Sequence, residues 1–112
     1  MNVSFDGVGQ VCATFLGLGL TEGCVVKVTG PGTAGPCKAG DDFCGAVLSC
    51  RDGACTVQLA GFITLPYSGA APATGWQTLD ADGHGGVKIA SDGREYLAVD
   101  VDETAETVTI ML

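Results

Sequence analysis

Cysteine is the residue type in this chain best suited to chemistry, and six are present: Cys12, Cys24, Cys37, Cys44, Cys50 and Cys55. A structural zinc site needs cysteines in pairs, two to four residues apart. Only Cys50 and Cys55 approach that spacing, and Arg51-Asp52-Gly53 between them predicts a hairpin turn. We expect no signal peptide ahead of the cysteines, so the sequence does not favour an oxidising compartment.

Four residues of one predicted strand share a face that is apolar: Cys44, Ala46, Leu48 and Cys50. We therefore expect cysteines that are mostly reduced and buried, as small hydrophobic side chains are, without a stoichiometric metal. Two alternatives stay open. One is a cross-strand disulfide between Cys50 and Cys55, although direct strand pairing strains its geometry. The other is a metal site.

Two glycine-rich segments match ligand-binding motifs in part. Gly30–Gly35 fits G-x-G-x-x-G after a predicted strand, but a dinucleotide site needs a helix there, and Pro36 follows instead. This segment predicts a loop. Asp80–Gly86 resembles part of a calcium loop, but it lacks a third acidic ligand and has Ser91 in place of the terminal glutamate. It predicts a solvated turn.

Catalytic residues are scarce. The one histidine, His84, lies in a glycine-rich turn, and the chain has no G-x-S-x-G motif. Because a serine or cysteine nucleophile needs a positioned base, we expect no enzymatic activity and no cofactor. The acids between Asp92 and Glu106 are expected on the solvent side of two strands and a turn.

The elements that must position these residues are short strands. Eighteen glycines interrupt the chain, and 26 of its 112 residues are β-branched. Such spacing leaves no room for a long helix, whereas Val and Thr favour strands. Several segments alternate with a period of two, and short connections favour antiparallel neighbours. The expected strands are Val11–Leu16, Val25–Thr29, Phe43–Cys50, Ala54–Ala60, Phe62–Pro66, Trp76–Leu79, Gly86–Ala90, Glu95–Val101 and Thr107–Leu112.

These strands predict an all-β fold, either a small antiparallel β-barrel or a β-sandwich with short glycine-rich turns. No linker or repeat divides the chain, so we expect one domain over residues 1–112. Residues 1–10 are expected to include a flexible N-terminal arm.

The charge balance excludes some partners. Thirteen acids against five bases give a formal net charge of −8, which opposes binding to a phosphate backbone. No apolar run reaches the ~20 residues of a transmembrane helix. No basic residue precedes the run Val11–Leu20, as it would in a signal peptide. We expect a soluble, unprocessed protein that binds neither nucleic acid nor membrane.

Four segments in order resemble a known family: GLTEGCVVKVTGPGTAGPCKAGDDFCGAVLS, GACTVQLAGFITLPYSG, APATGWQTLDADGHGGVK and YLAVDVDETAETVTIML. The segment that starts at Gly53 resembles a V-Q-x-x-G strand pair, and the one that starts at Ala71 resembles a G-W/Y-x-x-L-x-A-D-G hairpin. Together they make Gly19 to Leu112 similar to the capsid decoration, or cement, proteins encoded beside the major capsid genes of tailed phages. The cysteines are not part of this pattern.

The resemblance implies a compact β-barrel or β-sandwich without an active site. Its copies, often trimers, would sit on the outside of the assembled capsid and clamp subunits of the major capsid protein. It also implies a place on the virion surface, after synthesis in the cytoplasm of a bacterial host. The candidate contact residues come from irregular segments with apolar or aromatic groups: Asn2, Val3, Phe5, Tyr67 and Trp76.

Two other functions stay open. The chain is alternatively a small ligand-binding β-barrel, in which Tyr67 and Trp76 line a pocket. The second alternative is a domain built around a metal or a reactive thiol.

Overall fold

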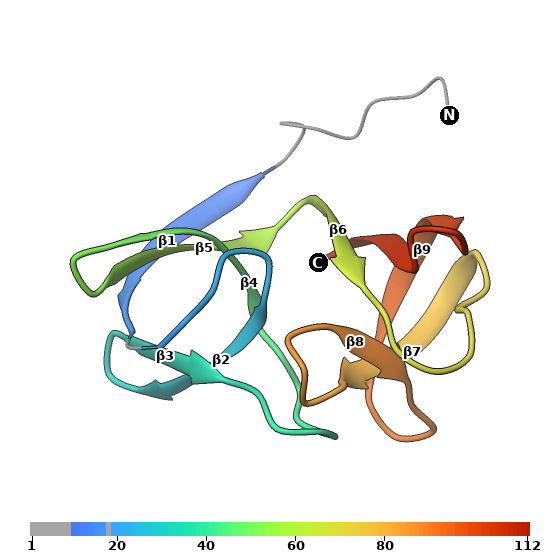
Figure 1. The fold of residues 1–112 in the computed structure, drawn as a ribbon, viewed down its shortest axis with the longest axis horizontal. Coiled ribbons are helices and arrows are strands. Elements are labelled where there is room, and N and C mark those ends of the chain that lie inside the picture. Colours follow the sequence, from blue (N-terminus) through green and yellow to red (C-terminus); the bar gives the residue numbers. More distant parts are fainter. Residues whose placement is uncertain (1–9, 18) are drawn as a thin grey trace.

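The computed structural model describes residues 10–17 and 19–112, which form ten β-strands and no helix. This part of the chain therefore has no helix long and apolar enough to cross a membrane. The strands form two five-stranded units that lie next to each other, one from each half of the sequence (Figure 1). The predicted all-β fold is confirmed. The sequence predicted either a barrel or a sandwich, and the first of the two units is a closed barrel.

The first unit, which we call the barrel half, comprises residues 10–17 and 19–60. Its strand order around the closed barrel is β1-β3-β2-β4-β5. Apart from one parallel contact between Leu16 and Thr33, its strands pair antiparallel. Its strands are β1 (Val11–Leu16), β2 (Val25–Gly30), β3 (Thr33–Pro36), β4 (Gly45–Arg51) and β5 (Ala54–Ala60).

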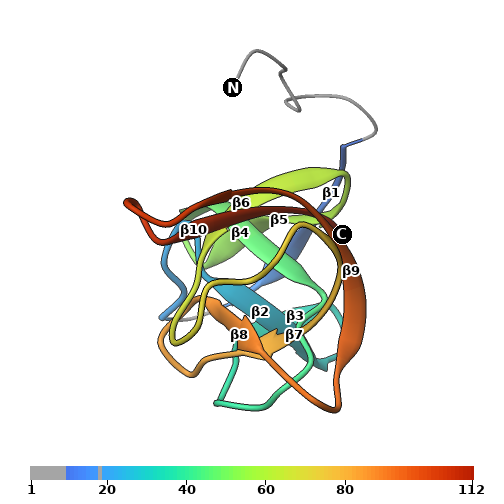
Figure 2. The same cartoon turned by 90° about the vertical axis from the view of Figure 1, so that its right-hand side faces the viewer.

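The second unit, which we call the sheet half, comprises residues 61–112. Its five strands lie in the order β6-β10-β9-β7-β8, and all their pairs are antiparallel. A parallel bridge between Tyr67 and Val87 brings the chain beyond β6 to β8, so the sheet is rolled. Figure 2 shows β6 and β10 running side by side. Its strands are β6 (Phe62–Pro66), β7 (Gly75–Ala81), β8 (Val87–Ile89), β9 (Arg94–Asp102) and β10 (Thr107–Met111).

The two units have different cores. The buried core of the barrel consists of small side chains, Val26, Ala34, Val47, Cys55 and Val57, against which Phe15, Leu20, Cys44 and Leu59 pack partly buried. The core of the sheet half includes larger ones, among them Leu65, Leu79 and Ile110. The rings of Phe43 and Tyr96 stack there with centroids 4.9 Å apart. Because Phe43 belongs to the barrel half, this cluster also joins the two units.

One strand was absent from the expectations. Gly30–Gly35 was predicted as a loop, but Thr33–Pro36 forms β3 and pairs with β2. The reversal is confined to Pro31 and Gly32, and Gly32 has the left-handed φ of 67° that favours glycine. A two-residue turn of this kind leaves the following residues free to pair.

The predicted apolar face of β4 was also wrong in part. The register with β5 shifts between Val47 and Ser49, so Leu48 lies at a bulge. Val47 is buried, whereas Leu48 is 38% exposed and Cys50 is exposed. A period of two does not reveal a bulge, which reverses the face of every residue after it.

Candidate docking surface

The outer face of the sheet half carries four apolar side chains in register across four strands, which we call the apolar row: Trp76, Leu97, Met111 and Phe62. Trp76 pairs with Leu97, Leu97 with Met111, and Met111 with Phe62. Paired side chains on antiparallel strands point to the same face, with Cβ atoms about 5 Å apart. Trp76 is 67% exposed and Met111 is 39% exposed. Leu97 and Phe62 are half-buried, so the row is an apolar strip on the surface that is most exposed at Trp76 and Met111.

Strand alternation explains why this strip faces outward. Tyr96 and Ala98 on β9 are buried in the core, so Leu97 between them points the other way. On β10, Ile110 is fully buried and Met111 next to it faces out. One face of β9 and of β10 therefore packs in the core, and the opposite face carries the apolar row.

A groove of about 500 Å³ lies beside the apolar row. Pro72 and Thr74, from the segment before β7, line it together with Asp100, Asp102 and Glu103 at the end of β9. Thr74 is only two residues before Trp76 in the chain, so the groove begins where the row ends. The lining combines small side chains with three carboxylates.

The turn between β9 and β10 holds one of these acids, Asp102, in place. Asp102 Oδ1 accepts the backbone N–H groups two and three residues further on, at 3.0 and 3.1 Å. The carbonyl of Glu106 accepts the N–H of Tyr67 at 3.0 Å. Burial, and then the negative charges of Glu103, Glu106 and Asp102, raises the pKa of Tyr67. Its phenol therefore stays protonated beneath the acidic turn.

Acidic charge also borders the row on its other side. Exposed Glu95 is in register with Thr78, one row beyond the pair of Trp76 and Leu97. The sheet half contains eight acids and only two bases, Lys88 and Arg94. Arg94 lies over the ring of Tyr96, 5.4 Å from its centroid, and so faces away from the row.

The predicted contact residues fall in different places. Trp76 is exposed, and it lies on β7 rather than in an irregular segment. Tyr67 is only 7% exposed and packs in the core of the sheet half, so its ring is not part of the docking surface. Asn2, Val3 and Phe5 lie outside the described residues.

Sequence reasoning missed the other members of the row. Leu97, Met111 and Phe62 come from segments whose strands were predicted, and alternation alone put Leu97 and Met111 on a face opposite their neighbours. Nothing in the alternation indicated which strands are adjacent or in what register. That register is what brings these residues beside Trp76.

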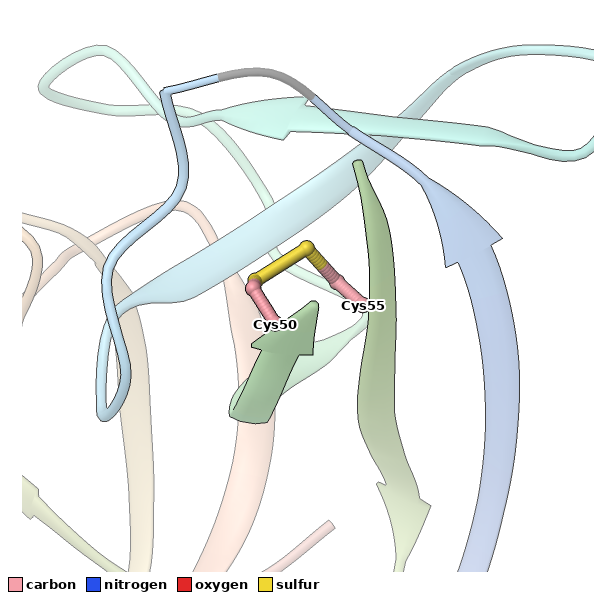
Figure 3. The surroundings of a disulfide bond; sticks show 2 residues. All are labelled: Cys50 and Cys55. Carbon is pink, nitrogen blue, oxygen red and sulfur yellow. A yellow bond between two sulfur atoms is a disulfide. The ribbon is translucent and has the colours of Figure 1, made fainter. Parts of the chain in front are cut away.

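The cysteines lie on the other half of the molecule. Cys50 and Cys55 are disulfide-bonded between β4 and β5, with Cα atoms 4.0 Å apart (Figure 3). The expectation of mostly reduced, buried thiols was wrong for this pair and for Cys12, which is free but exposed. The reason is the Asp52-Gly53 turn, whose φ angles of 54° and 80° fit a two-residue hairpin that sets Cys50 opposite Cys55.

Three further thiols are half-buried, those of Cys24, Cys37 and Cys44. Cys24, Cys37 and His84 line a pocket of about 130 Å³ between the two halves. Burial raises the pKa of Cys37 to about 11, so its thiol is protonated and weakly nucleophilic at neutral pH. Within residues 10–17 and 19–112, no three His, Cys, Asp or Glu side chains gather as metal ligands.

The segment resembling a calcium loop uses its acid internally. Asp82 Oδ1 accepts the N–H groups of His84 and Gly86, at 2.6 and 3.0 Å, and Ser68 donates to Oδ2 at 2.6 Å. Strand β7 extends to Ala81, two residues beyond the predicted end, so Asp80 is in a strand and not in a turn.

Comparison with known proteins gives this chain no relatives: no protein-family model, curated protein or solved structure matches it.

Proposed function

We propose that this protein is a structural virion protein that binds the exterior of an assembled phage capsid and stabilises it. The observation that carries the proposal is the apolar row, which exposes the single tryptophan of the chain on a strand. Large exposed apolar strips on soluble domains mark interaction sites, and tryptophan is the residue most enriched among energetic anchors. The ordered resemblance of Gly19 to Leu112 to capsid decoration proteins supports the choice of partner.

The mechanism is linkage between binding and lattice stability. Contacts made only with the assembled shell stabilise it relative to free subunits. A repeating lattice multiplies weak contacts, so one docking surface of modest size is enough for stable attachment when copies are joined. We propose a trimer as that joined form, placed at local three-fold positions of the capsid surface.

The ligand-binding alternative has less support. The barrel interior is filled by the small core side chains, of which Val26 and Val57 are fully buried. The pocket between the halves measures about 130 Å³, well below the roughly 300 Å³ at which small-molecule sites begin, and the groove of about 500 Å³ beside the row is lined by carboxylates and small side chains rather than by the mainly apolar side chains of such sites. Tyr67 and Trp76 do not line it together, since Tyr67 is buried in the core and Trp76 is exposed on β7.

The test is to add purified protein to expanded, undecorated phage shells and to image them. We expect ordered density on the outer surface and a rise in the temperature at which the shells break. Trp76→Ala should weaken attachment at least tenfold, as truncation of an aromatic anchor does. Leu16→Ala is the matched control, because Leu16 is 61% exposed on the barrel half. Bare shells at saturating protein, with no gain in heat stability, would refute the proposal.

A further inference from the structure

We propose that the docking surface selects a cationic segment of its partner, with Lys or Arg side chains on either side of an apolar one. The apolar side chain lies on the row at Trp76, and the basic side chains enter the acidic groove and reach Glu95. This inference deepens the proposed function and rests on it for the identity of the partner. The chemistry of the partner is argued from the surface alone.

The charges lie on both sides of the strip. Asp100 and Glu103 line the groove at one side of the row, and Glu95 lies at the next position on the same face at the other. Glu95 and Glu103 are exposed, so both reach an incoming partner. An apolar strip between two acidic borders matches a segment in which basic residues flank an apolar residue.

One base of the sheet half lies on this face: Lys88 is in register with Asp80, two residues beyond Thr78 on the same face of β7, on the edge strand β8 and away from the groove. The groove lining contains no Lys or Arg among the described residues. Arg94 is held over Tyr96 on the opposite face of β9, and Lys27 pairs with Asp41 at 2.6 Å in the barrel half. The negative potential of the docking surface is therefore available to a partner.

A second copy of this chain is a poor occupant. Two such faces brought together would place acids against acids, and like charges facing each other across an interface disfavour association. Nucleic acid is excluded for the same reason, because its phosphates carry the same sign. A basic protein surface is the partner that satisfies both the apolar row and the groove.

The experiment uses Trp76 as its own reporter, since it is the only tryptophan. Three blocked five-residue peptides with the same two leucines are titrated against the intact protein, with Lys, Ser or Glu at the other three positions. We expect a saturable change in tryptophan emission with the Lys peptide only. Raising the salt from about 20 mM to about 200 mM shortens the Debye length roughly threefold and should weaken this binding strongly.

Paired charge variants separate the docking surface from the overall negative charge. Asp100→Asn with Glu103→Gln should weaken the Lys peptide about threefold to tenfold, the range for two exposed ion pairs. Glu22→Gln with Asp52→Asn changes the net charge equally in the barrel half and should leave binding unchanged. Asp102 is kept, because its carboxylate holds the turn.

The outcomes are distinguishable from those of the shell test. Equal binding of the Lys and Glu peptides, or equal losses in the two double variants, overturns the inference whether or not shells are decorated. If the Lys peptide binds selectively and with salt sensitivity while the shells stay undecorated, the cationic partner is supported and the capsid is ruled out as that partner. The inference is also overturned if the protein decorates shells and neither added salt nor the double variant at Asp100 and Glu103 weakens its attachment.

Discussion

The barrel half and the sheet half are both rolled five-stranded units, yet they differ in almost every chemical respect. All six cysteines lie between residues 12 and 55, whereas the sheet half has none. The described barrel half holds four acids and three bases, whereas the sheet half holds eight acids and two bases. Barrel closure and a disulfide fix the first unit, whereas a large apolar core supports the second. The proposed docking surface therefore belongs to the half that contains no disulfide.

The largest expected difference between the halves concerns their cores. Ile110→Ala in the sheet half should lower the free energy of unfolding by about 3 kcal/mol, because it removes three carbons from a fully buried side chain. Val57→Ala in the barrel half removes less and should cost about 2 kcal/mol. Urea unfolding of the two variants measures both values. A larger loss for Val57→Ala would contradict the assignment of the stronger core to the sheet half.

Reduction of the disulfide tests the barrel half alone. The bond closes a short loop, with a sequence separation of 5, so chain entropy predicts a loss of about 2 kcal/mol on reduction. The measurement is urea unfolding with and without dithiothreitol. Cys50→Ser with Cys55→Ser should abolish the effect of the reductant, and Cys12→Ser should preserve it. An unchanged midpoint on reduction of the wild-type protein would show that barrel closure alone fixes this half.

Acid should act on the sheet half through Asp82. Burial alone would raise the pKa of Asp82, but hydrogen bonds from Ser68, His84 and Gly86 outweigh it and lower the pKa. A carboxyl whose pKa is lower when folded contributes stability above its unfolded pKa of about 4, and this is lost as the pH falls further. The contribution should stay below about 1 kcal/mol, since the site is largely solvent-screened.

Measuring the free energy of unfolding of Asp82→Asn between neutral and acid pH tests this. The deficit of the variant relative to wild type should be greatest at neutral pH and should shrink below about pH 4. Glu22→Gln, in an exposed loop of the barrel half, is the control. A deficit that grows on acidification would contradict the sign.

The smallest expected effect is a difference in fluorescence quenching. Acids around Trp76 should attract Cs⁺ and repel I⁻, so Cs⁺ should quench its emission more efficiently, relative to I⁻, than it does free N-acetyltryptophanamide. The Asp100→Asn and Glu103→Gln double variant should reduce that preference, and added salt should screen it. Equal accessibility to both ions at low salt would place Trp76 outside the acidic field.

Much of the fold could be predicted because the period of two is a local property. β1, β5 and β6 have the predicted bounds, since Gly17, Gly53 and Gly61 stand directly at their ends. β3 was missed because Thr33–Pro36 is short and contains glycine and proline, which are depleted in strands. The bulge at Leu48 depends on the partner strand β5, so no local pattern indicates it.

The candidate surface could be predicted only at Trp76. An aromatic side chain next to a long loop is a local signal, and it indicates this segment. Met111 acquires a role only because β10 lies between β6 and β9, a pairing set by loop closure and core packing rather than by neighbouring residues. The disulfide is among the sequence-based alternatives because its turn is local, but the strain expected of directly paired cysteines argued against it.

The place of β10 has a consequence for the order of assembly. All five barrel strands come from one continuous stretch ending at Ala60, so they can pair while the rest of the chain is still being made. The sheet half cannot, because β10 follows the other four strands of this half in the chain and lies between two of them, β6 and β9. The N–H of Leu112 then bonds to the carbonyl of Gly61 at 2.9 Å, where β5 passes into β6. A growing chain can therefore pair its barrel strands before the proposed docking surface, which needs β10, is able to form.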